Sequence, residues 1–372
     1  MLKTLQLTNF RGFEQLELKQ LNRVNLIVGD NNTGKTSILE ALYLLLGQAH
    51  KMGDFPSVFR AFERRPPGGG AYRSPTGTAY SSQQEGEYNR STENEPLPKP
   101  NRDAFERFWM WLFRDRQTTN SITVTASDES NVLRQVEVRT HPNEPGVIAR
   151  CFRVDPRSKG EVFRLNANGK TTFFAVNDPS IRVSRLSVQP SSPTEDAAKF
   201  NHAVNRPGGE ESAEAFMRQM EPRLRKLRYR KLETESEPIV YAEIGSLPEF
   251  IPSSQLGQAF TRMLHIYCEL MIEKAGLLLA DEIENGVYFS NLRPFWSGIY
   301  NLVEEQNSQI FATTHSFECM KTAHLAACER ADNGGTYDLN IIRLDRVDWG
   351  IKATEFGRET MEVAIAKGWE MR

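Results

Sequence analysis

The fold of this 372-residue chain is decided by the stretch Gly29-Asp30-Asn31-Asn32-Thr33-Gly34-Lys35-Thr36. It fits the pattern G-x-x-x-x-G-K-[ST], in which a glycine-rich loop surrounds phosphate groups. An apolar run at 24–28 precedes it and predicts a buried strand, and a helix-length run at 37–46 follows it. Strand, loop and helix in this order predict a triphosphate-binding loop. The alternative is an ordinary glycine-containing turn with a solvated Lys35.

The residue types of this loop suit phosphate chemistry. Gly29 and Gly34 let the backbone bend around a phosphate with no Cβ in the way. The positive end of the following helix favours an anion, Lys35 is expected to reach the β- and γ-phosphates, and the Thr36 hydroxyl to bind Mg²⁺. The other residues expected to contact ATP are Asp30, Asn31, Asn32, Thr33 and Ser37.

Composition and length predict an ordinary globular protein of about two domains or one large α/β unit. The formal net charge is −2, which gives no overall polycation signature for nucleic acid, and hydrophobic residues make up 39%. The four cysteines form no C-x-x-C pair and suit a reducing compartment. No apolar run has membrane-spanning length. We therefore expect a soluble, cytoplasmic protein with no membrane association.

Patterning along the chain predicts a mixed α/β fold with a parallel sheet, crossover helices and an antiparallel β-rich part. Expected strands cover 2–7, 15–18, 24–28, 122–125, 136–139, 147–154, 161–165, 171–176, 239–242, 277–280, 309–314 and 339–344. Expected helices cover 37–46, 58–62, 104–113, 214–224, 259–274, 295–305 and 359–366, and a loop is expected at 190–209.

Five segments follow from this patterning. They are the N-terminal half of an ATP-binding head (1–60), a flexible insertion (61–103), a β-rich part (104–190), a helical and basic insertion (191–235) and the C-terminal half of the head (236–372). Basic residues alternate with leucine and tyrosine over Arg223–Lys231. This segment fits a DNA-binding face or the solvated side of a hairpin, and both interpretations remain open.

A second half of the site is predicted far downstream. The apolar run at 277–280 ends in Asp281 and Glu282, and acids at the carboxyl end of a buried parallel strand lie where ligands bind. We expect Asp281 to hold Mg²⁺ beside Thr36 and Glu282 to accept a proton from, or orient, the attacking water. A second buried strand ends before His315, which is expected near the γ-phosphate. Solvated acids and a structural histidine are the alternatives.

Taken together, the phosphate loop, the Asp281-Glu282 strand and the strand that ends at Thr314-His315-Ser316 resemble ABC-type ATPases. The opening stretch at 5–13 is similar to the first hairpin of the branch that contains RecF, the SMC proteins and the OLD-type proteins. The stretch at 281–286 looks like stand-alone, OLD-like AAA-family ATPases. No long heptad tract separates the two half-sites, and we expect no Toprim nuclease domain after Ser316.

The resemblance implies a P-loop head that dimerises head to tail, with two ATP molecules between two copies. It identifies the segment 253–259 as the signature that closes the nucleotide site of the opposite head, with Ser254 and Gly257 as contacts, although the segment departs from L-S-G-G-Q. It also implies that Arg11 contacts nucleotide phosphate, and that a glutamine of the middle region senses Mg²⁺.

Three functions follow as hypotheses. The first is a Mg²⁺-dependent ATPase whose ATP-linked homodimer, or higher oligomer, controls a separate nuclease or toxin in anti-phage defence. The second is a RecF-like protein in which ATP gates DNA binding for repair. The third is a nucleotide-dependent scaffold with negligible turnover.

Overall fold

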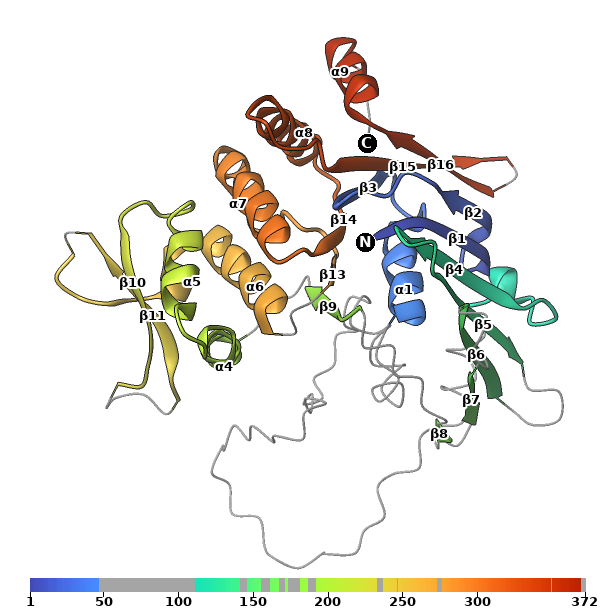
Figure 1. The fold of residues 1–372 in the computed structure, drawn as a ribbon, viewed down its shortest axis with the longest axis horizontal. Helices are drawn as coiled ribbons and strands as arrows, with labels where there is room; N and C mark the ends of the chain where they lie inside the picture. Colours follow the sequence, from blue (N-terminus) through green and yellow to red (C-terminus); the bar gives the residue numbers. More distant parts are fainter. Residues whose placement is uncertain are drawn as a thin grey trace, which may run out of the picture.

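The computed structural model describes most of the chain in eleven stretches (Figure 1). They are 1–46, 111–140, 146–154, 161–166, 171–172, 181–186, 192–232, 237–245, 247–272, 276–348 and 350–368, with side chains left out for 146–154, 161–166 and 171–172. The expected helix at 58–62, the insertion at 61–103 and the first part of the helix at 104–113 lie outside these stretches.

A six-stranded sheet forms the centre of the molecule. Its strand order is β16-β15-β3-β14-β13-β9, all parallel except for the antiparallel edge strand β16. The strands are β3 (Val24–Gly29), β9 (Val183–Leu186), β13 (Leu277–Ala280), β14 (Gln309–Thr313), β15 (Leu339–Val347) and β16 (Gly350–Phe356). The predicted strand–helix–strand arrangement with β13 next to β14 is confirmed.

Both faces of this sheet are covered, which explains why its strands read as continuous apolar runs. On β13, Leu277 and Leu279 pack into one core, whereas Leu278 and Ala280 pack into another on the opposite face. The first core contains helix α1 (Lys35–Leu46), which lies between this sheet and the second one in Figure 1. The predicted burial of this helix is confirmed.

The second sheet is antiparallel, with the strand order β2-β1-β4-β5-β6-β7-β8. Its strands are β1 (Leu2–Phe10), β2 (Phe13–Leu18), β4 (Ile122–Asp128), β5 (Leu133–Thr140), β6 (Gly146–Val154), β7 (Glu161–Asn166) and β8 (Thr171–Thr172). The opening hairpin and the predicted antiparallel meander are therefore confirmed.

Helices cover the other face of the central sheet (Figure 1). They are α6 (Gln258–Ile272), α7 (Leu292–Glu305), α8 (Phe317–Asp332) and α9 (Arg358–Ala366), whereas α4 (Pro193–Val204) and α5 (Gly209–Met217) pack against α6. Two short 3₁₀ turns are η3 (Ser253–Leu256) and η4 (Phe289–Asn291). A small sheet of β10 (Leu224–Arg230), β11 (Ile239–Ile244) and β12 (Ile251–Pro252) packs beside α4 and α5. None of the helices in the described stretches is long and apolar enough to cross a bilayer.

The loop predicted at 190–209 is wrong, because α4 occupies most of it. Ser192 caps this helix by accepting a hydrogen bond from the Glu195 backbone, and the Glu195 side chain accepts one from the Ser192 backbone. Pro193 stands in the first turn, where its missing N–H does no harm. Phe200 and its apolar neighbours on one face then pack into the core. The polar composition concealed a capping box with an amphipathic helix behind it.

Three further boundaries differ from expectation. The helix predicted at 214–224 is α5, which begins at Gly209 and ends at Met217, before a turn and strand β10. Residues 111–113, predicted as the end of a helix, form a turn and a bridge between Phe113 and Phe10, followed by η2 (Arg114–Arg116). Helix α8 was not predicted, since its alanine-rich sequence lacks a strong apolar stripe. The five predicted segment boundaries stay predictions.

Candidate active site

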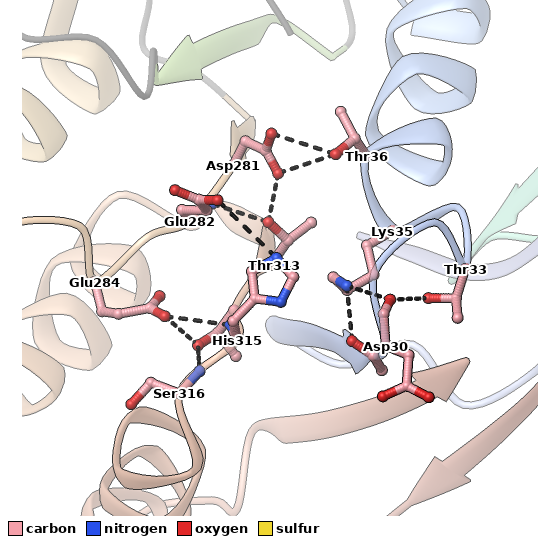
Figure 2. Close-up of polar contacts among 12 residues, drawn as sticks. Asp30, Thr33, Lys35, Thr36, Asp281, Glu282, Glu284, Thr313, His315 and Ser316 are labelled. Carbon is pink, nitrogen blue, oxygen red and sulfur yellow. Dashed lines mark hydrogen bonds and ion pairs between the residues drawn. The ribbon is translucent and has the colours of Figure 1, made fainter. Parts of the chain in front are cut away.

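The candidate site lies where β3, β13 and β14 end at the same edge of the central sheet (Figure 2). The phosphate loop follows β3, Asp281 and Glu282 follow β13, and Thr314 and His315 follow β14. Since parallel strands end at a common edge, residues 245 positions apart, such as Thr36 and Asp281, come into contact. The predicted juxtaposition of the two half-sites is present in the structure.

The two loop glycines are required by their surroundings as well as by their backbone angles. Gly29 has φ of +133°, and a Cβ there would lie 2.3 Å from the backbone oxygen of Leu344 on β15. Gly34 has φ of +88°, and its Cβ would lie 2.7 Å from the ring of Phe13. Both neighbours are buried. The loop is thus pressed between β15 and the first hairpin, and a side chain at either position would displace it.

Lys35 points back into its own loop. Its Nζ donates to the backbone oxygens of Gly29 and Asp30, each at 2.7 Å, and Thr33 Oγ1 donates to the Asp30 oxygen at 2.8 Å. Burial lowers the pKa of the Lys35 amine, which nearby Asp281 partly offsets. The amine therefore holds the loop curled through bonds to two of its backbone oxygens.

Asp281 and Thr36 form a pair that suits a small cation. Thr36 Oγ1 lies 3.3 Å from both carboxylate oxygens of Asp281, and Thr313 Oγ1 donates to Asp281 Oδ1 at 2.5 Å. Neighbouring ligands of an octahedral Mg²⁺ lie about 2.9 Å apart, so hydroxyl and carboxylate are close to that spacing. Burial raises the pKa of Asp281. A bound cation would supply the positive charge that this buried carboxylate lacks.

Glu282 has a strained backbone. Its φ is +47°, a conformation that residues other than glycine seldom adopt. Its N–H donates to Thr313 Oγ1 at 2.9 Å, and its Oε1 lies 4.0 Å from His315 Nε2. Left-handed backbone of this kind costs about 1–3 kcal/mol and persists where neighbouring contacts impose it. Thr313 therefore positions both acids, the first through its carboxylate and the second through its backbone.

Glu284 fixes the segment that carries His315. Its Oε1 accepts from Thr314 Oγ1 at 2.5 Å and from the His315 backbone at 3.3 Å, while its Oε2 is buried and has no hydrogen-bond partner among the residues that the structure describes. Ser316 then caps α8 by accepting from the Cys319 backbone at 3.0 Å. The end of β14 is thus tied to the chain after β13 by two hydroxyl–carboxylate bonds.

Arg262 holds the backbone of the acidic segment from the other side. This buried side chain of α6 donates to the carbonyl oxygens of Asp281, Glu282 and Ile283 at 3.0–3.1 Å. Burial lowers the pKa of its guanidinium to about 10, and Glu284, Asp281 and Glu282 oppose that effect. Since Arg262 bonds to the Glu282 carbonyl, it helps to impose the left-handed conformation there.

A small open pocket connects the two halves of the site. Its volume is about 190 Å³, which suits one phosphate group more than a whole nucleotide. Its wall on one side is the phosphate loop at 28–31, and on the other the start of α8, with His315, Ser316 and Phe317. The positive end of α8 and the loop N–H groups favour an anion between them. Asn31 is an exposed residue of its lining, and Asn32 is exposed next to it in the loop.

Three of the predicted nucleotide contacts lie apart from this cluster. Arg11 donates through Nε and Nη2 to both carboxylate oxygens of the buried Glu40 on α1, at 3.1 and 3.0 Å. Ser254 and Gly257 are exposed at the start of α6. Ser37 is half-buried in the first turn of α1.

Several functional residues were missed by sequence reasoning. Thr313 and Glu284 stand next to residues that were singled out, so their position could have suggested them. Arg262 could have been noticed as a charged residue within the apolar face of the helix at 259–274. Nothing in the sequence around Glu40 singles out this residue in a comparable way. The Mg²⁺-sensing glutamine was predicted without a residue number, and it stays a prediction.

Comparison with known proteins gives three findings. An ATP/GTP phosphatase from Helicobacter pylori is 21% identical over 343 residues, covering 86% of both chains. The RecF DNA replication and repair protein from Idiomarina loihiensis is 42% identical over 60 residues, which are 16% of this chain and 17% of RecF. The SMC head domain from Thermotoga maritima has a TM-score of 0.45 at 13% identity, covering 95% of this chain and 98% of that one.

The family model of the AAA ATPase domain matches residues 1–227. Together with the sequence relatives, this match confirms the predicted P-loop ATPase fold and its place in the ABC-type branch that includes RecF. The OLD-like detail stays a prediction. More than half of the chain matches the family model, and the phosphate loop lies within the match, so this protein belongs to the AAA ATPase domain family and is a nucleotide-binding ATPase.

Proposed function

We propose that the chain hydrolyses ATP with Mg²⁺ at the site formed by the phosphate loop, Asp281, Glu282 and His315. The observation that carries this proposal is the contact between Thr36 and Asp281, which brings the two half-sites together. An open anion-sized pocket lies between the phosphate loop and the start of α8. Lys35 and the loop N–H groups bind the phosphates, and Thr36 and Asp281 hold Mg²⁺. When bound, Mg²⁺ neutralises charge on the β- and γ-phosphates.

Glu282 orients or deprotonates the attacking water in this proposal. Its carboxylate is partly exposed next to His315, and its backbone is fixed by Thr313 and Arg262. A fixed carboxylate acts efficiently because no reorganisation is needed when charge develops. His315 faces the pocket and stabilises the charge on the γ-phosphate. Phosphoryl transfer requires this positioning and charge stabilisation and no covalent chemistry by the protein.

We further propose that a second copy of the chain completes the site upon ATP binding. Ser254 and Gly257 are exposed at the start of α6, where a helix N-terminus is available for a phosphate of another head. Nearby, Gly286 packs against Gln258, so the segment after Glu282 and the start of α6 form one surface. Arg11 joins the nucleotide contacts if its bonds to Glu40 exchange.

The variant Glu282→Gln tests both proposals. It keeps the size of the side chain and removes the base, so we expect ATP binding with negligible hydrolysis and a dimer that accumulates with ATP and Mg²⁺. Light scattering after size-exclusion chromatography measures the mass. Glu305→Gln, at the exposed end of α7, is the matched control and should behave as wild type. A variant that binds ATP yet stays monomeric at micromolar concentration would refute the completion by a second copy.

The output of the dimer is proposed to reach a separate effector, a nuclease or a toxin, as the resemblance to OLD-like ATPases implies. The Glu282→Gln protein purified with ATP should retain such a protein, whereas Lys35→Ala should not. A turnover assay of the wild type against Lys35→Ala separates this proposal from a scaffold, because a scaffold would give equal and negligible rates for both.

A RecF-like role in DNA binding is the second candidate, and the match to RecF is its support. Its predicted contact segment, Arg223–Lys231, is largely strand β10, and four of its cations are paired with acids. The pairs are Arg223–Glu221, Arg225–Glu243, Lys226–Glu214 and Arg228–Glu210. This pairing reduces the charge available to phosphates. Reversing the exposed Arg225 to glutamate should weaken salt-sensitive DNA binding if this candidate holds.

A further inference from the structure

A cluster of metal-binding residue types lies between α8 and α9, outside the nucleotide site. His324 and Cys328 are four residues apart on α8, so they share one face of the helix. Glu362 reaches the same place from α9, and the candidate ligand atoms of all three lie within 4.8 Å of one another. His324 is buried, Cys328 is half-buried and Glu362 is exposed. One side of the cluster is therefore buried, and the other is open to solvent.

The spacing of the two helix residues fits zinc. Zinc binds sulfur at about 2.3 Å and imidazole nitrogen at about 2.0–2.1 Å, so a tetrahedral pair of these ligands lies about 3.5 Å apart. Cys328 Sγ lies 3.6 Å from His324 Nε2. The sulfur also lies 3.9 Å from Nδ1, so it sits beside the ring and not along the Nε2 lone pair, and the Cys328 side chain must rotate to share an ion with Nε2. The exposed Glu362 carboxylate needs to approach by about 1 Å to reach a similar spacing.

Tyr337 fixes which ring nitrogen of His324 keeps its lone pair. Its hydroxyl is 2.9 Å from His324 Nδ1, and the two rings meet edge to face. If Nδ1 carries the proton and donates it to this hydroxyl, Nε2 keeps the lone pair that a metal ion needs. Metal-binding histidines usually have such an outer partner on the second nitrogen. Tyr337 supplies this partner in advance.

From this arrangement we propose that His324 Nε2, Cys328 Sγ and Glu362 form a Zn²⁺ site that links α8 to α9, with water as the fourth ligand. Binding breaks the S–H bond of Cys328, forms the Zn–S bond and releases one proton to solvent. Arg358 contacts Glu362 Oε1 at 3.0 Å and Asp332 at 2.9 Å. The carboxylate must exchange Arg358 for zinc, and Asp332 keeps the guanidinium paired when it does.

Direct titration of the nucleotide-free protein tests the proposal. Zn²⁺ added in competition with a chromophoric chelator should bind at one per chain with submicromolar affinity, and Co²⁺ should give a thiolate-to-metal charge-transfer band. Cys328→Ser should abolish that band and lower zinc affinity at least tenfold. Tyr337→Phe should lower it about 10–100-fold. Glu359→Gln, an exposed acid three positions before Glu362, is the matched control and should change neither.

The nucleotide site also contains acids and a histidine, so the titration is repeated with Asp281→Asn, which should keep the zinc. Folding of each variant is checked by circular dichroism, and Glu362→Gln, which leaves the buried His324 in place, should also lower zinc affinity. Zinc affinity unchanged in Cys328→Ser, a cobalt spectrum without a thiolate band, loss of binding in Asp281→Asn, or affinity weaker than micromolar would each overturn the proposal.

Discussion

Replacing Arg262 by methionine should destabilise the protein and slow its ATPase reaction. Methionine is similar in length and apolar, so it can fill the space on α6 without donating hydrogen bonds. The three carbonyl oxygens of Asp281, Glu282 and Ile283 then lose the charged donor that they share. Because Glu282 has φ of +47°, its backbone is free to relax toward a common conformation.

The size of the effect follows from the contacts. A hydrogen bond from a charged group contributes about 1.5–3 kcal/mol, so three such bonds contribute about 4.5–9 kcal/mol. Burial of the guanidinium opposes them, and its pKa of about 10 corresponds to a cost of about 3 kcal/mol. The net loss of folding free energy is therefore about 1.5–6 kcal/mol. The loss in kcat should come in addition, because the relaxed backbone moves the Glu282 carboxylate.

Urea unfolding followed by circular dichroism measures the first quantity, and steady-state turnover with an independent ATP-binding titration measures the second. Arg293→Met is the matched control, since this arginine of α7 is exposed and pairs with Glu329 at the surface, where such pairs contribute about 0–1 kcal/mol. A loss below about 1 kcal/mol for Arg262→Met, or kcat equal to the wild type, would refute the reasoning.

Three further substitutions have definite outcomes. Burial raises the pKa of Asp281 above its ordinary 3.8. The stability that this group contributes is therefore present below pH 3.8 and is lost as pH rises through the pKa of the folded state. At pH 7, without metal or nucleotide, Asp281→Asn should have a higher melting temperature than wild type, and this difference should vanish below pH 3.8. Gly34→Ala should cost about 1–3 kcal/mol more than Gly334→Ala in urea unfolding, because both have φ near +90° but only Gly34 faces Phe13. Glu284→Gln replaces the charged acceptor of the Thr314 and His315 hydrogen bonds by a neutral one. A resulting loss of about 1.4 kcal/mol of transition-state stabilisation lowers kcat about tenfold and leaves ATP affinity unchanged.

The parts of the fold that were predicted correctly from the sequence are those that short sequence patterns specify. The strand at 24–28, the loop and the helix behind it are consecutive, and the strand at 277–280 is apolar up to its two acids. Each pattern is set by a few neighbouring residues, and strand ends of a parallel sheet bring them to one edge. The same local reasoning should have found α4, because Ser192 and Glu195 have capping-box spacing.

The remaining parts depend on contacts between residues far apart in the sequence. Nothing near Arg262 indicates that its partners are the carbonyls at 281–283, and nothing near Arg11 indicates that Glu40 holds it. Backbone carbonyls have no sequence signal at all. The left-handed conformation of Glu282 is likewise imposed from outside, by Thr313 and Arg262, because glutamate has no intrinsic preference for it.

The position of β3 in its sheet has a consequence for biosynthesis. This early strand pairs on both sides with late ones, since Val24 is opposite Ile310 on β14 and Leu339 on β15. At a translation rate of about 5–20 residues per second, the first of these partners is made roughly 15–60 s after β3. Until then the ribosome-bound chain presents an unpaired apolar strand and an unfinished nucleotide pocket. We expect chaperone binding to this nascent segment, and ATP cannot assist folding before the last third of the chain has emerged.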